Sequence, residues 1–141
     1  MREFLAADRF FFASHVEDKG YLEIVDGKFG QYYKTLPDEK VNIIDQSGKW
    51  IAPGLVDTHI HGFKNHDVMD NDAQGMNEIS EGLLSCGVTS FLPTTLTSSR
   101  KHLKDVAKML GEVKGSEKGA KIQGIYFEGP FFTEEHKGAQ N

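Results

Sequence analysis

From residue 50 onward, the sequence alternates between segments patterned as β-strands and segments patterned as α-helices. Three strands and two helices are predicted in alternation, at residues 50–61, 73–85, 88–95, 99–113 and 121–128. Asp72 is expected to cap the first helix and Ser98 or Ser99 the second, because each precedes a run in which apolar residues recur every three or four positions. Strands that alternate with helices form parallel sheets, so this part of the chain is predicted to have an α/β architecture.

The first 50 residues lack this alternation and predict a small antiparallel sheet. Its strands are expected at Phe10–Val16, Tyr21–Val25, Lys28–Tyr33 and Val41–Asp45. Asp26-Gly27 is a strong signal for a two-residue hairpin turn. The aromatic cluster at residues 10–12 is expected to pack in the core of this sheet. We therefore expect two domains, residues 1–50 and residues 51–141.

A candidate metal site lies in the segment Pro-Gly-Leu-Val-Asp-Thr-His-Ile-His-Gly, residues 53–62. A strand repeats its side-chain direction every second residue, so His59 and His61 share one face and their Cα atoms lie about 6.6 Å apart. Imidazole is a ligand for divalent zinc, iron and nickel. The alternative is that the two histidines face solvent, or satisfy each other's hydrogen bonds.

A second apolar run, Gly124-Ile-Tyr-Phe, leads to Glu128, after which Gly129-Pro130 cannot continue a strand. This pattern presents a carboxylate at a strand end. Parallel strands of a barrel bring their C-terminal ends to one rim, so His59, His61 and Glu128 are expected to converge despite their separation in sequence.

The first motif resembles the first barrel strand of the amidohydrolase superfamily, whose histidine pair binds catalytic metal. Together with the glutamate motif, Thr89–Thr95 and Lys137–Asn141, it makes residues 50–141 similar to the N-acetylglucosamine-6-phosphate deacetylase family. The resemblance implies the first three β/α units of a metal-dependent TIM-like (β/α)8 barrel. It also implies that the N-terminal strands are part of a small β-sandwich domain.

This resemblance also implies a site and a reaction. His59, His61 and Glu128 would bind one or two divalent metal ions, with zinc or iron expected, and Gln140 and Ala139 would contact the amino-sugar phosphate substrate. The implied reaction is hydrolysis of N-acetylglucosamine 6-phosphate to glucosamine 6-phosphate and acetate by water activated on metal. The family's catalytic aspartate, its general acid and base, is expected beyond residue 141.

A complete barrel of this kind needs about 250 residues, whereas the chain has 141. We therefore expect it to be the N-terminal part of an enzyme that is inactive as an isolated piece and a homodimer at full length. The alternatives are another metal-dependent amidohydrolase, such as a cyclic-amide hydrolase or a deaminase, and a fragment without activity. Glu128 disfavours the former, since many of those enzymes bridge their metals with a modified lysine.

Three further residues near the motifs have two interpretations each. Asp57 lies on the strand face of His59 and would either orient a histidine ring or make a structural contact. Thr94 and Thr95 would either line the pocket or serve as ordinary strand residues.

Composition excludes several functional classes. The net charge of −5 offers no basic surface for nucleic acid. No run approaches 18 apolar residues and no secretion signal is recognisable, so neither a membrane span nor export is predicted. The single cysteine, Cys86, excludes an intrachain disulfide. A cytoplasmic enzyme acting on a small molecule is the expectation.

Overall fold

The computed structural model describes residues 1–37 and 40–140. The chain divides into two compact units, Met1–Pro53 and Gly54–Asn141. The fold is mixed α/β, as the sequence predicted, and in these described ranges the helices lie in the second unit.

The first unit is a four-stranded sheet with strand order β3-β2-β1-β4. Its strands are β1 (Arg2–Phe11), β2 (Val16–Val25), β3 (Lys28–Tyr33) and β4 (Asn42–Ile51). The prediction of a purely antiparallel sheet was wrong, because β1 and β4 are parallel while β1, β2 and β3 pair antiparallel.

The first strand also differs from its prediction, since it begins at Arg2 and ends at Phe11. Its buried residues Phe4, Ala7 and Phe10 recur every third position, and the pairing with β4 shifts register between Ala7 and Arg9. This irregularity hides the period-two pattern by which a strand is recognised.

The hairpin predicted at Asp26-Gly27 is confirmed and joins β2 to β3. Both residues have positive φ, at 49° and 75°, as a type I′ turn requires. Phe10 is buried, as predicted, and its ring packs edge-on against Tyr32 with centroids 5.6 Å apart. It forms a small core with Ala7 and Leu22.

The second unit contains a parallel sheet of strand order β10-β8-β5, with β9 also paired to β8. The strands are β5 (Leu55–Ile60), β8 (Val88–Thr95), β9 (Lys121–Ile122) and β10 (Tyr126–Phe127). The strand predicted at Val88–Thr95 is confirmed. The strand predicted at Trp50–His61 is divided, because Pro53-Gly54 separates the end of β4 from β5.

The strand predicted at Lys121–Glu128 consists of the two short pieces β9 and β10, and Glu128 directly follows the second. Between β5 and the first helix lie a two-stranded ribbon, β6 (Gly62–Phe63) and β7 (His66–Asp67), and the 3-10 turn η1 (Val68–Asp70).

Both predicted helices are present, as α1 (Ala73–Leu84) and α2 (Arg100–Val113). The Asp72 carboxylate accepts a hydrogen bond from the N–H of Gln74 at 2.9 Å, and the Ser99 hydroxyl accepts one from the N–H of His102 at 3.2 Å, so both expected caps form. No helix in the described ranges is long and apolar enough to cross a membrane.

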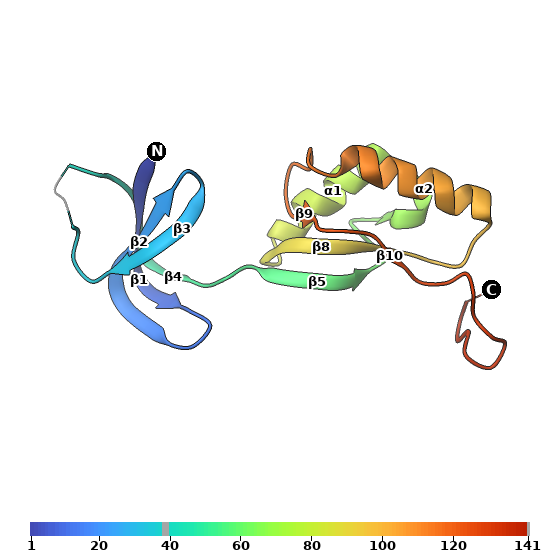
Figure 1. Ribbon diagram of the computed structural model, residues 1–141, viewed down its shortest axis with the longest axis horizontal. Helices are drawn as coiled ribbons and strands as arrows, with labels where there is room; N and C mark the ends of the chain where they lie inside the picture. Colours follow the sequence, from blue (N-terminus) through green and yellow to red (C-terminus); the bar gives the residue numbers. More distant parts are fainter. Residues whose placement is uncertain (38–39, 141) are drawn as a thin grey trace. The chain divides into compact units, whose positions relative to one another are not determined.

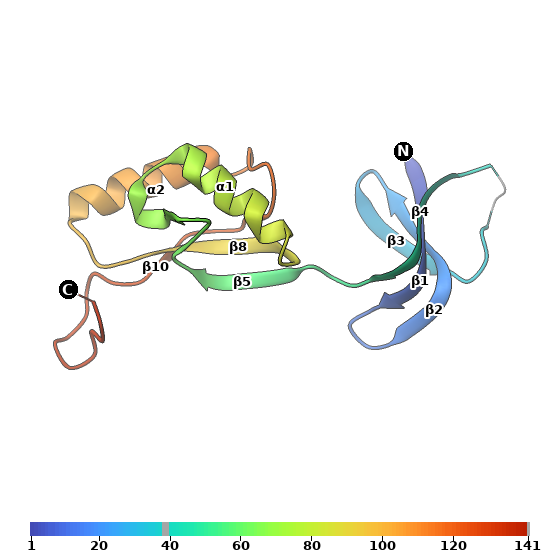
Figure 2. The same cartoon turned by 180° about the vertical axis from the view of Figure 1, so that it is seen from behind.

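Both helices lie on the same side of the β5-β8-β10 sheet (Figures 1 and 2). Their apolar faces pack on β8 and β9 and form the main core with residues such as Met76, Ile79, Phe91, Val106, Leu110 and Ile122. Within the sheet, β8 pairs with β5 on one side and with β10 on the other, so the two outer strands end on either side of it.

Candidate metal centre

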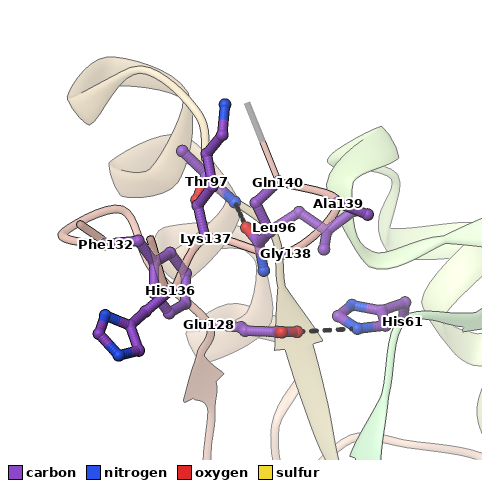
Figure 3. Close-up of a pocket in the computed structure, with 10 residues that line it drawn as sticks. All are labelled: His61, Leu96, Thr97, Glu128, Phe132, His136, Lys137, Gly138, Ala139 and Gln140. Atoms are coloured by element: carbon purple, nitrogen blue, oxygen red, sulfur yellow. Dashed lines mark hydrogen bonds and ion pairs between the residues drawn. The ribbon is translucent and has the colours of Figure 1, made fainter. Parts of the chain in front are cut away.

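Three side chains converge where β5 and β10 end on either side of β8. His59 is the next-to-last residue of β5, His61 directly follows that strand, and Glu128 directly follows β10. Glu128 Oε2 lies 3.0 Å from the Nε2 atom of each histidine, and the two Nε2 atoms lie 3.1 Å apart. His61 and Glu128 point toward one another across this gap (Figure 3).

The tautomer of His61 follows from its second hydrogen bond. Its Nδ1 lies 3.1 Å from the backbone carbonyl oxygen of Thr94. A carbonyl oxygen can only accept, so Nδ1–H donates, and the Nε2 atom of the neutral ring keeps its lone pair for the centre.

The donor set fits a divalent transition metal. One ligand atom from each of His59, His61 and Glu128 lies within 4.8 Å of the others. Two imidazole nitrogens and one carboxylate oxygen are ligands that zinc and iron accept, and three protein ligands leave further coordination positions open.

The Glu128 carboxyl is held in its anionic form. Burial raises its pKa, but hydrogen bonding with His59, the nearby Gln140 amide and the positive charge that the two imidazoles carry when protonated outweigh burial, so the pKa lies below its usual value. A carboxylate that is ionised at neutral pH is the form that binds metal.

A pocket of about 500 Å³ opens beside Glu128 (Figure 3). It is lined by two strand-end residues and by the segments that follow β8 and β10: His61, Leu96, Thr97, Glu128, Phe132, His136, Lys137, Gly138, Ala139 and Gln140. Both predicted substrate residues, Ala139 and Gln140, therefore lie in its wall, whereas Asn141 of the same motif lies outside the described residues.

Gln140 is oriented by the segment that follows β8. Its Oε1 accepts the N–H of Thr97 at 2.7 Å, which leaves the buried Nε2 as a donor without a partner in the described part of the chain. The buried hydroxyl of Thr97 is likewise unpartnered there. Thr97 and His136 were not predicted as pocket residues. The one sequence signal that could have indicated them is that both lie in segments that follow predicted strands.

The side chains of two further candidates, Asp57 and Thr94, accept hydrogen bonds from backbone N–H groups. Asp57 accepts the backbone N–H of His59 at 3.1 Å, and the described residues show no hydrogen bond between its carboxylate and a histidine ring. Thr94 is fully buried, and its hydroxyl accepts the N–H of Ile60 at 3.0 Å instead of lining the pocket.

No protein-family model matches the chain. Among curated relatives, the N-acetylglucosamine-6-phosphate deacetylase of Vibrio furnissii is 32% identical over 126 residues, covering 88% of this chain and 30% of that protein. The N-acetylgalactosamine-6-phosphate deacetylase of Escherichia coli O157:H7 is 31% identical over 123 residues, covering 86% of this chain and 32% of that protein. The chain thus spans about a third of the length of these relatives.

Solved structures share the fold. N-acetylglucosamine-6-phosphate deacetylase from Pasteurella multocida superimposes with a TM-score of 0.83 at 24% identity, covering all of this chain and 38% of that one. A D-hydantoinase superimposes with a TM-score of 0.64 at 20% identity, covering 96% of this chain and 29% of that one.

The fold that this chain shares with these enzymes brings two histidines and a glutamate together at the strand ends. Sequence similarity then identifies the family. The chain belongs to the N-acetylglucosamine-6-phosphate deacetylase family, as its motifs predicted, and represents part of such a protein.

Proposed function

We propose that the whole protein hydrolyses the acetamide of N-acetylglucosamine 6-phosphate to give glucosamine 6-phosphate and acetate. The observation that carries this proposal is the convergence of His59, His61 and Glu128 at one end of a parallel sheet, in a chain whose curated relatives are named as deacetylases of this sugar phosphate.

In this proposal, His59, His61 and Glu128 hold a divalent cation, with zinc or iron expected. When bound, that cation polarises the acetyl carbonyl and lowers the pKa of water so that a nucleophile is available at neutral pH. Glu128 supplies the negative charge of the ligand set, and the Thr94 carbonyl keeps the Nε2 lone pair of His61 directed to the centre.

Substrate positioning is assigned to the segment that follows Glu128. The oriented Gln140 amide offers its buried N–H₂ group as a donor to a sugar or acetyl oxygen. Ala139 forms the neighbouring part of the pocket wall. A polar group that is buried without a partner is stabilised when a ligand supplies the missing acceptor.

The finer architecture is part of the same proposal. The parallel sheet of the second unit would be the first part of a (β/α)8 barrel, and the four-stranded sheet of the first unit would be part of a β-sandwich. The general acid and base would lie outside this chain. Assembly of the whole enzyme as a homodimer and its location in the cytoplasm remain predictions.

A second candidate substrate is N-acetylgalactosamine 6-phosphate. The Escherichia coli relative is named as its deacetylase and is nearly as similar to this chain as the Vibrio furnissii relative. The two sugars differ only in the orientation of one hydroxyl group, so a direct comparison of kcat/KM on both decides between them.

The proposal is tested by acetate release and metal content in the whole enzyme and its Glu128→Gln variant. Loss of a group that merely supports a metal ligand costs about 10- to 100-fold in affinity or activity, so loss of the ligand anion itself is expected to cost more than about 100-fold. Glu134→Gln is the matched control, because Glu134 is 89% exposed and pairs only with Lys137 among the described residues.

Turnover in the parent and the control, with loss of both metal and turnover in Glu128→Gln, supports the proposal. Bound metal without turnover on either sugar phosphate would contradict the assigned substrate. Full activity in Glu128→Gln would contradict the assigned metal site.

A further inference from the structure

The end of β5 loses its regular pairing with β8 where it carries the two histidines. Asp57 is aligned with Phe91, whereas Ile60 is aligned with Pro93, so three steps along β5 correspond to two steps along β8. The extra residue on β5 makes this a β-bulge. Pro93 adds to the irregularity, because proline has no N–H to donate to a neighbouring strand.

Two side chains bind backbone N–H groups within this bulge. The Asp57 carboxylate accepts the N–H of His59 at 3.1 Å. The Thr94 hydroxyl accepts the N–H of Ile60 at 3.0 Å. The backbone on either side of the His59 Cα is therefore held by side chains, one from β5 itself and one from β8.

Thr94 is connected to the centre in two ways. Its fully buried hydroxyl accepts from Ile60 and donates to the carbonyl oxygen of Leu92 at 3.0 Å, so its position is fixed on β8. Its own carbonyl oxygen accepts Nδ1–H of His61 at 3.1 Å. A single residue therefore joins the backbone between the two histidines to the ring of the second.

We propose that the side chains of Asp57 and Thr94, here called the β5 clamp, position His59 and His61 for binding a divalent cation by holding the backbone N–H groups of the bulge. This inference rests on the proposed metal site and adds two positioning residues to it. Neither side chain contacts the cation in this scheme, and both act through the β5 backbone.

Positioning residues are needed because metal ligands must be placed precisely. Coordination geometry tolerates deviations of about 0.5 Å in a ligand position. Side chains on a strand change face with each single-residue slip, and a bulge has fewer ladder hydrogen bonds to resist such movement. The β5 clamp supplies side-chain acceptors to the N–H groups of His59 and Ile60.

The test compares Thr94→Val with Thr94→Ser in the whole enzyme. Valine keeps the shape and the backbone carbonyl but removes the hydroxyl, whereas serine keeps the hydroxyl. Thr95→Val is the matched control, because Thr95 is equally buried and its hydroxyl has no hydrogen-bond partner within the described ranges. Asp57→Ala probes the other half of the clamp.

The readouts are the Kd for Co²⁺, measured by competition with a chelator, the visible absorption spectrum of bound Co²⁺, and the melting temperature of each metal-free protein. Thr94→Val and Asp57→Ala are expected to weaken Co²⁺ binding about 10- to 100-fold and to alter the spectrum. Thr94→Ser and Thr95→Val are expected to stay within about threefold of the parent, since neither removes a clamp hydrogen bond.

A purely structural role would lower the melting temperature of Thr94→Val without changing its Kd or spectrum, and that result would overturn the inference. If Thr94→Val does not fold, Asp57→Ala decides in the same way, and parent-like binding by that variant overturns the inference. If the parent itself binds no metal, the proposed metal site fails first. If the parent binds metal and the clamp variants match it, only the clamp fails.

Discussion

Gln140 illustrates how one residue in a loop becomes part of a site. Its carbonyl oxygen accepts the N–H of Thr97, 43 positions earlier in the chain, so the amide is held in one orientation. Its buried N–H₂ group then has no partner among the described residues and lies beside the Glu128 carboxylate in the pocket wall. Because the oxygen of the amide is already bonded and its nitrogen is not, Gln140 is suited to donate a hydrogen bond to a ligand.

The variant Gln140→Leu is expected to raise KM for the sugar phosphate about fivefold, because one buried hydrogen bond is worth about 1 kcal/mol. Metal content is expected to remain unchanged. Steady-state kinetics and metal analysis check both. Gln123→Leu is the control, since the exposed Gln123 donates to Ser90 outside the pocket. An unchanged KM in Gln140→Leu would remove Gln140 from the substrate site.

At the scale of elements, the connection from α2 to β9 is organised around a buried carboxylate. Glu117 is only 5% exposed. Its two oxygens accept the N–H groups of Gly115 and Ile122, each at 2.8 Å. The sequence predicts nothing of this kind, because a glutamate in a polar, glycine-rich stretch has the pattern of an exposed loop residue.

The variant Glu117→Gln is expected to destabilise this connection by about 1–3 kcal/mol, because an amide presents a donor where one N–H needs an acceptor. Amide hydrogen exchange at Gly115 and Ile122 measures the effect locally. Glu112→Gln is the control, since among the described residues Glu112 makes only a surface ion pair with Lys108, and it is expected to change stability by less than about 0.5 kcal/mol.

The same carboxylate predicts a pH dependence. Burial raises the pKa of Glu117, but the backbone N–H groups and Lys121 outweigh it, so the folded pKa lies below the usual 4.5. The unfolded chain therefore binds the proton more tightly. The stabilisation is fully present above pH 4.5 and is lost as the pH falls through the folded pKa. Exchange at Ile122 should accelerate over that window beyond the intrinsic pH effect in the parent, and not in Glu117→Gln.

The contact between α1 and the segment before β9 depends on one glycine. A Cβ atom on Gly119 would lie 2.3 Å from the carbonyl oxygen of Ser80, which belongs to the α1 backbone. Ser80 also accepts the N–H of Gly119 through its hydroxyl at 3.0 Å and that of Ala120 through its carbonyl at 2.9 Å. The close approach lets these hydrogen bonds form.

Two glycine-to-alanine variants are expected to act in opposite directions. Gly119→Ala should lower stability by about 1–3 kcal/mol, because helix backbone cannot yield to the added methyl group. Gly111→Ala should raise it by about 0.5–1 kcal/mol, because Gly111 lies in α2 with open space around it. Denaturant unfolding of the whole enzyme measures both. Equal effects of the two changes would contradict the close approach.

At the scale of the whole molecule, the second unit exposes apolar side chains on its outer strands. Leu55 and Val56 on β5 are 61% and 62% exposed, and Phe127 on β10 is 47% exposed. In the described residues, β5 and β10 each pair with β8 alone. Unpaired strand edges that carry large apolar residues favour association with other chains.

We therefore expect this 141-residue polypeptide, expressed by itself, to aggregate or to melt without a cooperative transition. Size-exclusion chromatography with light scattering and thermal circular dichroism measure this. Val56→Lys should reduce the aggregated fraction, because a charge on an edge strand opposes pairing. A monomer with one sharp melting transition in the unmodified polypeptide would contradict the prediction.

Local sequence patterns determined much of this protein. The caps at Asp72 and Ser99, the strand at Val88–Thr95 and the Asp26-Gly27 turn were all predictable, because each depends on residues within a few positions of one another. The family followed from short motifs for the same reason, and the convergence of His59, His61 and Glu128 followed from the rule that parallel strands end together.

Only the tertiary structure decided the parallel pairing of β1 with β4, the bulge at the end of β5, the burial of Glu117 and the orientation of Gln140 by Thr97. The strand pairing, the bulge and the Gln140 contact depend on groups that lie far apart in sequence and meet only after the sheets and helices have packed. The hydrogen bonds of Glu117 are local, but its burial requires the same packing. Side-chain identity specifies which hydrogen bonds are possible, but the folded positions of the partners select which of them form.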